Sequence, residues 1–427
     1  MAEINSFDTG ASSETSGGEA EGLTSVDVDF GGISESDLLL EDFTIREVTM
    51  TESLLTPGLQ TAVKFQSFLH NMPPKNFDKL KGVDLNITIK RPILGKYGYK
   101  EDMKVSQILY RMGGRSAINP LTTDNRKMVD RAVEELSFHA CDITLLNNQM
   151  NLVSKSWKCI PPSFIVNEVL RSCTGAKRLN IEPSDPPRDY IAENIHPFQV
   201  VSQQANAALA GGNDPSFVHF MTYENMGTHH FRSLKTMCEQ SPIIELEYSN
   251  NGKAYMSRNG IMNYVFPCDF DILSDIMNGV GENGDLLNSL ALFNPAIKLF
   301  ALLGNQSRGC GIGGAVHKVL KSNFGSEIFE NSCPDFLYLY GQKRQGRMVL
   351  LERDKVALRL TVPWNTIYNV GKVIKVKFKN EGDKTGQAEN YGSGTYLISS
   401  LVHNIRAGGY STITMDCVAT TAGKGIV

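Results

Sequence analysis

The sequence lacks the patterns that mark membrane-spanning proteins, secreted proteins and several classes of enzyme. No apolar run approaches the roughly 18–20 residues that a transmembrane helix needs. The N-terminus has no basic segment followed by an apolar stretch, so we expect no signal peptide and no membrane anchor. Walker, GxSxG and HExxH motifs are also absent. The sequence therefore gives no motif evidence for P-loop nucleotide hydrolysis, serine hydrolysis or zinc proteolysis.

Cysteine and histidine are present but do not form recognisable sites. The eight cysteines are scattered without a CxxC pair, and the eight histidines show no metal-ligand spacing. This pattern predicts free thiols in a protein made in a reducing cytoplasm. His229 and His230 are adjacent, so in a strand they would face opposite sides and could not readily share a metal. We therefore predict no catalytic residue, no metal and no cofactor.

A glycine-rich stretch, 309–314, matches the GxGxxG spacing. That spacing binds a dinucleotide where a strand precedes the glycines and a helix follows them. Residues 294–303 are instead predicted to be helical, so we interpret 309–314 as a loop between helices. A carboxylate pair of the glycosidase type meets only in space, and the sequence leaves that alternative open.

Charge divides the chain into an acidic N-terminus and a basic body. Residues 1–42 contain eleven of the 46 acidic residues and no basic ones, so the rest of the chain is net positive. Gly, Ser and Glu dominate residues 1–41, which predicts a flexible acidic arm. The alternative is an arm that orders on a partner subunit, anchored by Val26–Phe30 and Leu38–Leu40. The bases of the body do not cluster as in a nucleic-acid binder.

Alternating apolar and polar residues predict five strands early in the chain. They cover 43–50, 62–68, 80–90, 133–141 and 149–157, with Pro57 and Gly58 in a turn. We assign them to a first β-barrel domain, 42–158. Within it, 92–130 is rich in Gly, Lys and Arg and is predicted to be a solvated insert. Contact of its basic residues 96–100 with nucleic acid is the alternative.

The middle of the chain changes from strand to helix periodicity. A helix capped by Ser163 and ending at Gly175 is followed by a helix over 199–210. These form a predicted helical connector, 159–215. A mixed α/β domain follows over 216–340. Its predicted elements are a hairpin of 217–223 and 228–233, a helix 234–240, a strand 243–248 and helices 270–277 and 286–303.

The C-terminal part again has the alternation of strands. Strands are predicted over 359–364, 370–378, 395–403 and 411–418, joined by Gly-rich turns. They predict a second antiparallel β-barrel domain, 341–427. The predicted fold class is therefore α+β and β-rich, with two similar antiparallel β-barrels and helical and mixed α/β insertions between them.

Several motifs follow one another in order over residues 43–420. They are Phe43–Val48 with Leu54–Gly58, Leu136–Asp142 with Val153–Trp157, Asn194–Phe198 with its helix, Val218–Met221, Glu224–Gly227, His230–Leu234, Asn369–Lys372 and Gly394–Thr412. This series resembles the baseplate hub of contractile-tailed bacteriophages and the related hub part of type VI secretion spike proteins. The stretch from Asn194 to Leu234 is the most specific part of the resemblance. The acidic arm is not part of the shared pattern.

The resemblance implies a structural role. A homotrimer with two barrels per subunit would form a ring that adapts the six-fold tail tube to the three-fold spike and lets DNA pass without specific binding. The chain ends soon after the second barrel, so we expect the trimeric spike to be a separate protein. Other expected partners are the tail tube or tube initiator and further baseplate or wedge proteins. The expected location is the virion tail baseplate, after synthesis in the bacterial host cytoplasm.

Two other functions are compatible with the sequence. The chain could be another tail ring, such as a distal-tail or tube-initiator protein. It could also be a cell-wall hydrolase of the tail tip, which would need a cleft containing an acid of raised pKa. The number of subunits separates the first alternative from a hub, and an accessible acid would favour the second.

Overall fold

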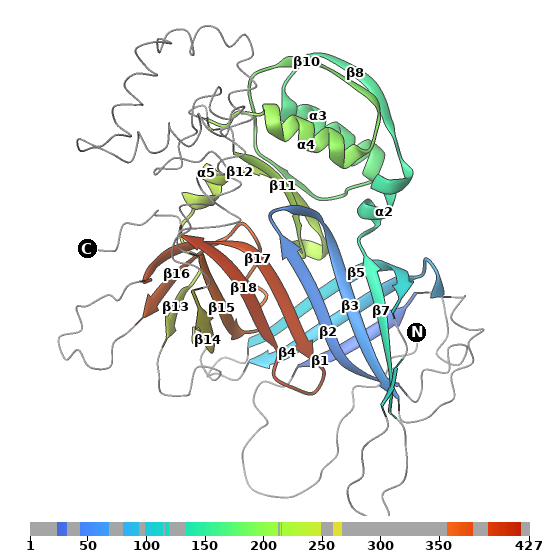
Figure 1. Cartoon of the computed structure of the whole chain (residues 1–427), viewed down its shortest axis with the longest axis vertical. Helices are drawn as coiled ribbons and strands as arrows, with labels where there is room; N and C mark the ends of the chain where they lie inside the picture. The colour runs from blue at the N-terminus through green and yellow to red at the C-terminus, as the bar shows by residue number, and fades with distance from the viewer. Residues whose placement is uncertain are drawn as a thin grey trace, which may run out of the picture.

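The computed structural model describes residues 24–31, 43–67, 80–93, 99–113, 116–118, 133–211, 214, 216–248, 259–266, 357–378 and 392–419. Within them, the chain is rich in antiparallel strands and has few helices (Figure 1). No helix of these residues is long and apolar enough to cross a bilayer. The predictions for 270–277, 286–303, 309–314 and Leu38–Leu40 lie outside the described residues.

One sheet of 13 strands runs through most of the molecule. Its first half contains seven strands from the N-terminal part: β1 (Ser25–Phe30), β2 (Phe43–Ser53), β3 (Thr56–Ser67), β4 (Asp84–Ile93), β5 (Tyr99–Met112), β6 (Ser116–Ile118) and β7 (Val133–Cys141). Its second half contains six later strands: β13 (Glu245–Tyr248), β14 (Asn263–Val265), β15 (Ala357–Pro363), β16 (Val373–Phe378), β17 (Gly394–Arg406) and β18 (Thr412–Ala419). The order β1-β4-β5-β7-β3-β2-β17-β18-β15-β14 makes the two halves continuous.

The two ends of the second half meet. In this half β13 pairs with β16, and β16 with β17. The residues leading into β14 then bond back to β13, because Glu247 N donates to Asn259 O at 2.9 Å and Ile261 N donates to Glu247 O at 3.1 Å. An aromatic group of Tyr248, Tyr264 and Phe378 packs beside this contact, with Tyr248 and Tyr264 centroids 4.7 Å apart.

The first half closes less completely. Its two outer strands, β1 and β2, do not pair with each other, since β2 pairs with β3 and β17. Thr24 nevertheless reaches the turn between β17 and β18, where Gly408 N donates to Thr24 O at 2.9 Å. The predicted two closed barrels are therefore seen as two curled halves of one sheet, and their closure as barrels stays a prediction.

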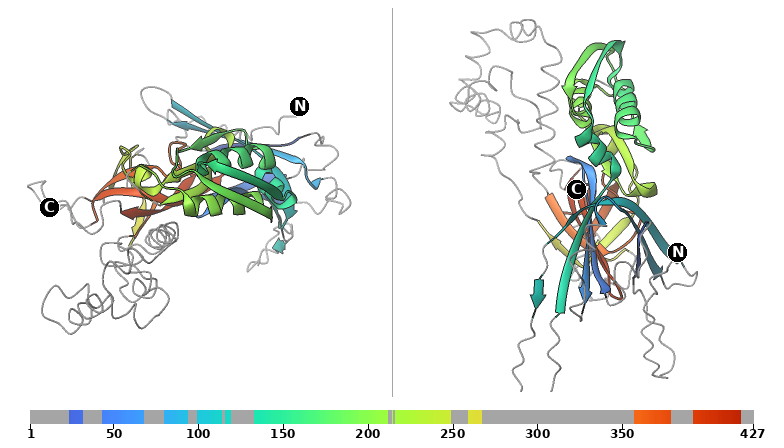
Figure 2. Two further views of the ribbon diagram at one scale, coloured as in Figure 1. Left: turned by 90° about the horizontal axis from the view of Figure 1, so that it is seen from above. Right: turned by 90° about the vertical axis from the view of Figure 1, so that its right-hand side faces the viewer.

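A smaller head lies on the large sheet (Figures 1 and 2). It consists of α2 (Ile143–Met150), β8 (Val153–Ile160), α3 (Pro162–Val169), η3 (Leu170–Thr174), β9 (Leu179–Ile181), β10 (Arg188–Ile195), α4 (Pro197–Ala207), β11 (Phe217–Thr222), η4 (Glu224–Met226), β12 (Thr228–Ser233) and α5 (Leu234–Cys238). Strands β8 and β10 form one small sheet, and β11, β12 and β9 another. The helices α3 and α4 lie between these sheets in Figure 1.

Four predicted boundaries differ from the structure. The flexible-arm prediction does not hold for residues 24–31, because β1 pairs with β4 and buries Val26, Val28 and Phe30. The predicted insert 92–130 contains the whole of β5 and β6, which continue the sheet. Residues 143–158 belong to the head and not to the first half, since β8 pairs with β10. Similarly, β13 and β14 lie within the predicted domain 216–340 but pair with β16 and β15.

The predicted turn at Pro57 and Gly58 and the predicted helix cap at Ser163 also differ from the structure. The turn between β2 and β3 falls at Leu54 and Leu55, so Pro57 and Gly58 lie inside β3. Ser163 does not cap α3 as predicted, because the N-cap position is Pro161 and has no side-chain bond. Ser163 instead exchanges hydrogen bonds with Ser184, at 2.8 and 3.2 Å. Gly175 does end this helical stretch, with the left-handed φ of 72° that was expected of a C-cap.

Candidate functional site

The strand pair β2–β17 joins the two halves of the sheet, and we take it as the candidate site. Strand β17 is shared: residues 394–397 pair with β16, and residues 400–406 pair with β2. An irregularity at Ser399 separates these parts, and Leu54 N donates to the Ser399 carbonyl at 2.9 Å. An irregularity of this kind bends a strand and changes its direction. Strand β17 can therefore pair with β16 of the second half before Ser399 and with β2 of the first half after it. We call this region the joint.

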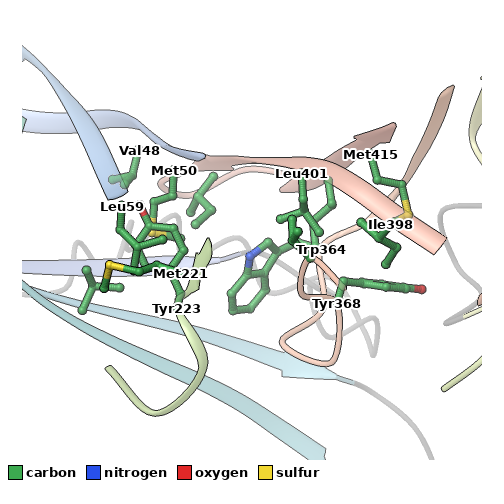
Figure 3. Close-up of a cluster of buried hydrophobic side chains, with 14 of the residues drawn as sticks. Val48, Met50, Leu59, Met221, Tyr223, Trp364, Tyr368, Ile398, Leu401 and Met415 are labelled. Atoms are coloured by element: carbon green, nitrogen blue, oxygen red, sulfur yellow. The ribbon is translucent and has the colours of Figure 1, made fainter. Parts of the chain in front are cut away.

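Large apolar side chains from both halves and the head fill the joint. Figure 3 shows Trp364 between side chains of the first half and side chains of the second half. Trp364 and Tyr368 are fully buried, and Tyr223 of the head reaches into the same cluster. All of them belong to one continuous hydrophobic core that includes both halves. The halves therefore share a core as well as a sheet.

Glu52 is a buried carboxylate that links three distant segments at the joint. Its side chain is 2 % exposed. One oxygen accepts a hydrogen bond from Tyr223 N at 2.7 Å, and the other accepts one from Val370 N at 2.9 Å. Burial raises the pKa of Glu52 to about 7, the two backbone N–H donors lower it, and Glu224 adds a small raising effect. A strand of the first half thus holds both the head and the second half through one side chain.

The segment that meets Glu52 is shaped by a glycine. Gly371 has a φ of +81°, and an added Cβ would lie 2.9 Å from both the Met237 sulfur and Phe220 Cζ. A residue with a side chain would therefore be strained as well as crowded at this position. Gly371 N donates to Ile398 O at 3.0 Å, which ties the turn to β17. The Asn-Val-Gly-Lys motif quoted for the resemblance is the sequence signal of this turn.

Other polar groups at the joint are also paired inside the core. The Tyr223 hydroxyl donates to Gln60 O at 2.7 Å and lies 3.1 Å from Thr61 Oγ1. Burial raises the Tyr223 pKa, so the hydroxyl keeps its proton. Trp364 Nε1 donates to His403 Nδ1 at 3.2 Å. Burial lowers the pKa of His403 to about 3, so this histidine is neutral and structural at physiological pH.

The head contains a chain of buried histidines. His219 Nε2 lies 3.1 Å from His229 Nδ1, and His229 Nε2 lies 3.0 Å from Thr144 Oγ1. His230 faces the other side and contacts Thr222 Oγ1 at 2.9 Å, which confirms that the adjacent pair His229 and His230 point apart. Burial is the main cause of their low pKa values, about 3 for His229 and about 4 for His230.

No predicted catalytic or ligand residue is available to compare with the structure, because the sequence singled none out. Among the described residues, no group of three His, Cys, Asp or Glu side chains could hold a metal ion. Glu52 was missed because its partners are 171 and 318 positions away in the sequence. Glu52 also lies just beyond the predicted strand 43–50, whereas β2 continues to Ser53. The alternation of Thr49, Thr51 and Ser53 with Met50 and Glu52 is the weak signal that could have extended that strand.

Three apolar side chains in this part of the head are exposed. Ile191 of β10 is 64 % exposed, and Met150 at the end of α2 and Leu152 just before β8 are 70 % and 50 % exposed. Trp157 of β8 is buried instead, and its Nε1 donates to Glu168 of α3 at 2.8 Å. Apolar residues exposed singly are normal on a protein surface, so these three do not define a binding surface.

No protein-family model matches the chain, and a comparison with curated protein sequences gives no match. Solved structures do resemble it. A 43 kDa tail protein of a Shewanella oneidensis prophage has a TM-score of 0.49 and 10 % identity, covering 94 % of this chain and 99 % of its own. A Neisseria meningitidis tail protein has a TM-score of 0.48 and 11 % identity, covering 92 % and 96 %.

A third similar structure is a component of the Escherichia coli type VI secretion system, with a TM-score of 0.44 and 8 % identity, covering 92 % of this chain and 76 % of its own. The structural neighbours are thus phage tail and baseplate proteins and proteins related to type VI secretion spikes. This is the class that the sequence resemblance indicated.

Proposed function

We propose that the chain is a structural subunit of a phage tail baseplate, and specifically its hub. The observation that carries the proposal is the joint, where two halves of one sheet meet about the pair β2–β17. Outward from this pair, each half presents first an antiparallel hairpin, β2–β3 in one half and β17–β18 in the other. A third antiparallel strand follows in each, β7 beside β3 and β15 beside β18.

In the proposed hub, each half of the sheet is one of two tube-like β-barrels. In the second half, the bonds between Glu247 and residues 259–261 support closure. In the first half, the contact of Thr24 with the β17–β18 turn supports it. A trimer of such chains would present six similar units with three-fold exact symmetry. It could therefore meet a six-fold tube on one face and a three-fold spike on the other.

The proposed partners follow from that position. They are two further copies of the chain, a separate trimeric spike protein, the tail tube or its initiator, and other baseplate or wedge proteins. DNA would pass through the lumen without specific binding, since tight phosphate contacts would hold it there. The location would be the baseplate of the virion tail, after synthesis in the host cytoplasm.

The geometry gives less support to the hydrolase alternative. The described acid with a clearly raised pKa is Glu52, the kind of group that a glycosidase uses as general acid. Its side chain is buried, however, and each oxygen accepts a backbone N–H. A substrate could reach it only if the joint opened.

The molecular mass in solution tests the proposal. The purified protein would be measured by light scattering and native mass spectrometry, alone and mixed with a candidate spike protein. We expect a trimer, or a monomer that becomes a 3:3 complex with the spike. A monomer or dimer indifferent to the spike would contradict the hub, and a hexamer would favour a ring of the tube type.

A further inference from the structure

No short turn joins strand β1 to β4, the strand with which it pairs. Strand β1 comes just before β2 in the sequence, yet it lies at the opposite edge of the first half, beyond β4, β5, β7 and β3. Eleven residues, 32–42, separate Gly31 from β2. A strand in a short hairpin is held by its turn, whereas β1 must be held by what it contacts.

The inner face of β1 fills an aromatic groove. Val26, Val28 and Phe30 alternate along the strand and are all buried. The Phe30 ring centroid lies 6.2 Å from that of Phe65 and 6.0 Å from that of Phe138. The Phe65 and Phe138 rings also contact each other, at 5.4 Å. The rest of the first half therefore forms a groove lined by Phe65 and Phe138, which one extended segment fills.

Polar groups also contact the outer face and both ends of β1. Asp27 pairs with Lys90 at 3.6 Å, and Asn86 Nδ2 donates to Asp29 Oδ2 at 3.3 Å. At one end Gly31 N donates to Asp84 O at 2.8 Å, and at the other Thr24 is bonded to the β17–β18 turn. The groove thus selects a segment of defined length, with apolar and acidic residues in alternation.

We propose that this groove is a strand-acceptor site and that, when copies of the chain come together, it takes the Thr24–Gly31 segment of a second copy. The same backbone and side-chain contacts form whether the segment comes from the same chain or another, which is why strand exchange is a low-cost form of association. Eleven connecting residues can reach about 36 Å when extended. The inference goes beyond the proposed hub function and does not depend on it.

The charges of the arm and the body also suit a segment that comes from a second copy. Residues 1–42 contain no basic residue, while the rest of the chain has an excess of bases. Opposite net charges attract the arm of one copy to the body of another as they do within one copy. Lys90, which contacts Asp27, is one of the body's bases and is half exposed beside the groove.

Disulfide trapping between two chains tests the proposal. Asp29 and Asn86 are register partners across β1 and β4, at the separation that a cross-strand disulfide needs. Chains carrying Asp29→Cys alone would be mixed with chains carrying Asn86→Cys alone, both with Cys159→Ser because Cys159 is exposed. After incubation at high concentration and oxidation, we expect a covalent dimer whose peptide mass spectrum shows the link between positions 29 and 86.

Two controls define the outcome. The double variant Asp29→Cys/Asn86→Cys must form the link within one chain, which shows that the geometry permits it. A mixture of Thr44→Cys and Gln66→Cys, register partners within the β2–β3 hairpin, should form no dimer, because a hairpin strand cannot exchange in this way. The proposal is overturned if the double variant links but the mixed single variants do not, or if the hairpin mixture links equally well.

Discussion

The two halves of the large sheet satisfy their edges in different ways. The first half is built from long strands, 10 to 14 residues in β2, β3, β4 and β5, and its outer edge is covered by β1. The second half uses strands of three to eight residues apart from β17, and its ends bond to each other near Glu247. Open edges invite pairing with other chains. The second half therefore joins its own ends through the bonds of Glu247 with residues 259–261, whereas the first half adds the strand β1 to its outer edge.

The shared core should make the two halves unfold together despite this difference. Trp364→Ala removes a fully buried indole at the joint, and large aromatic-to-alanine changes in cores cost about 3–5 kcal/mol. We expect a loss of that size in the free energy of unfolding, with one transition for both halves, measured by urea denaturation. Phe164→Ala, at a position 56 % exposed, should change it by less than about 1 kcal/mol. Two separate transitions in Trp364→Ala would show that the halves are independent.

The stability of the joint, where the halves meet, should depend on pH through Glu52. The folded pKa of Glu52, about 7, lies above the ordinary value of 4.5, so the folded state binds this proton more tightly than the unfolded state. The contribution is complete below about pH 4.5 and is lost as the pH rises through 7, a change of about 3 kcal/mol. Glu52→Gln cannot titrate and should lack this change.

The measurement compares urea denaturation of wild type and Glu52→Gln at pH 5 and pH 8. The difference between the two proteins should move in favour of the variant at the higher pH. Glu47→Gln is a matched control on the same strand, where Glu47 pairs with Lys64 at the surface at 2.9 Å. If wild type and Glu52→Gln show the same pH dependence, Glu52 does not carry a raised pKa.

The smallest effects are expected from ion pairs on the outer faces of the halves. Arg46 pairs with Glu135 in the first half, and Arg359 pairs with Asp416 in the second at 2.6 Å. Both arginines and Asp416 are exposed and Glu135 is partly exposed, and surface pairs of this kind contribute about 0.2–1 kcal/mol. Double-mutant cycles to alanine should give coupling energies in this range for both pairs, decreasing with added salt. A coupling well above this range in one half would show that its pair is shielded from solvent.

Sequence patterns predicted many elements because local alternation was enough to specify them. Val133–Cys141 was predicted with the bounds that β7 has, and the β11–β12 hairpin was predicted almost as it is. By contrast, β1 was assigned to an arm because Asp27 and Asp29 lie in an acidic, Ser-rich stretch. Its acids face outward, where Lys90 and Asn86 contact them. Helix α2 was partly assigned to a strand, because the predicted strand 149–157 included its last two residues, Gln149 and Met150.

The β-rich character, most of the strands and the order of motifs that resembles a baseplate hub can be predicted from the sequence. These depend on residues that are close in the chain, where side-chain periodicity and turn residues act directly. Three features became visible in the folded chain alone: the two halves form one sheet, β17 pairs with strands of both, and Glu52 links Tyr223 to Val370. Such contacts join residues far apart in sequence, and one sequence carries no local signal of which distant backbone groups will meet a buried carboxylate.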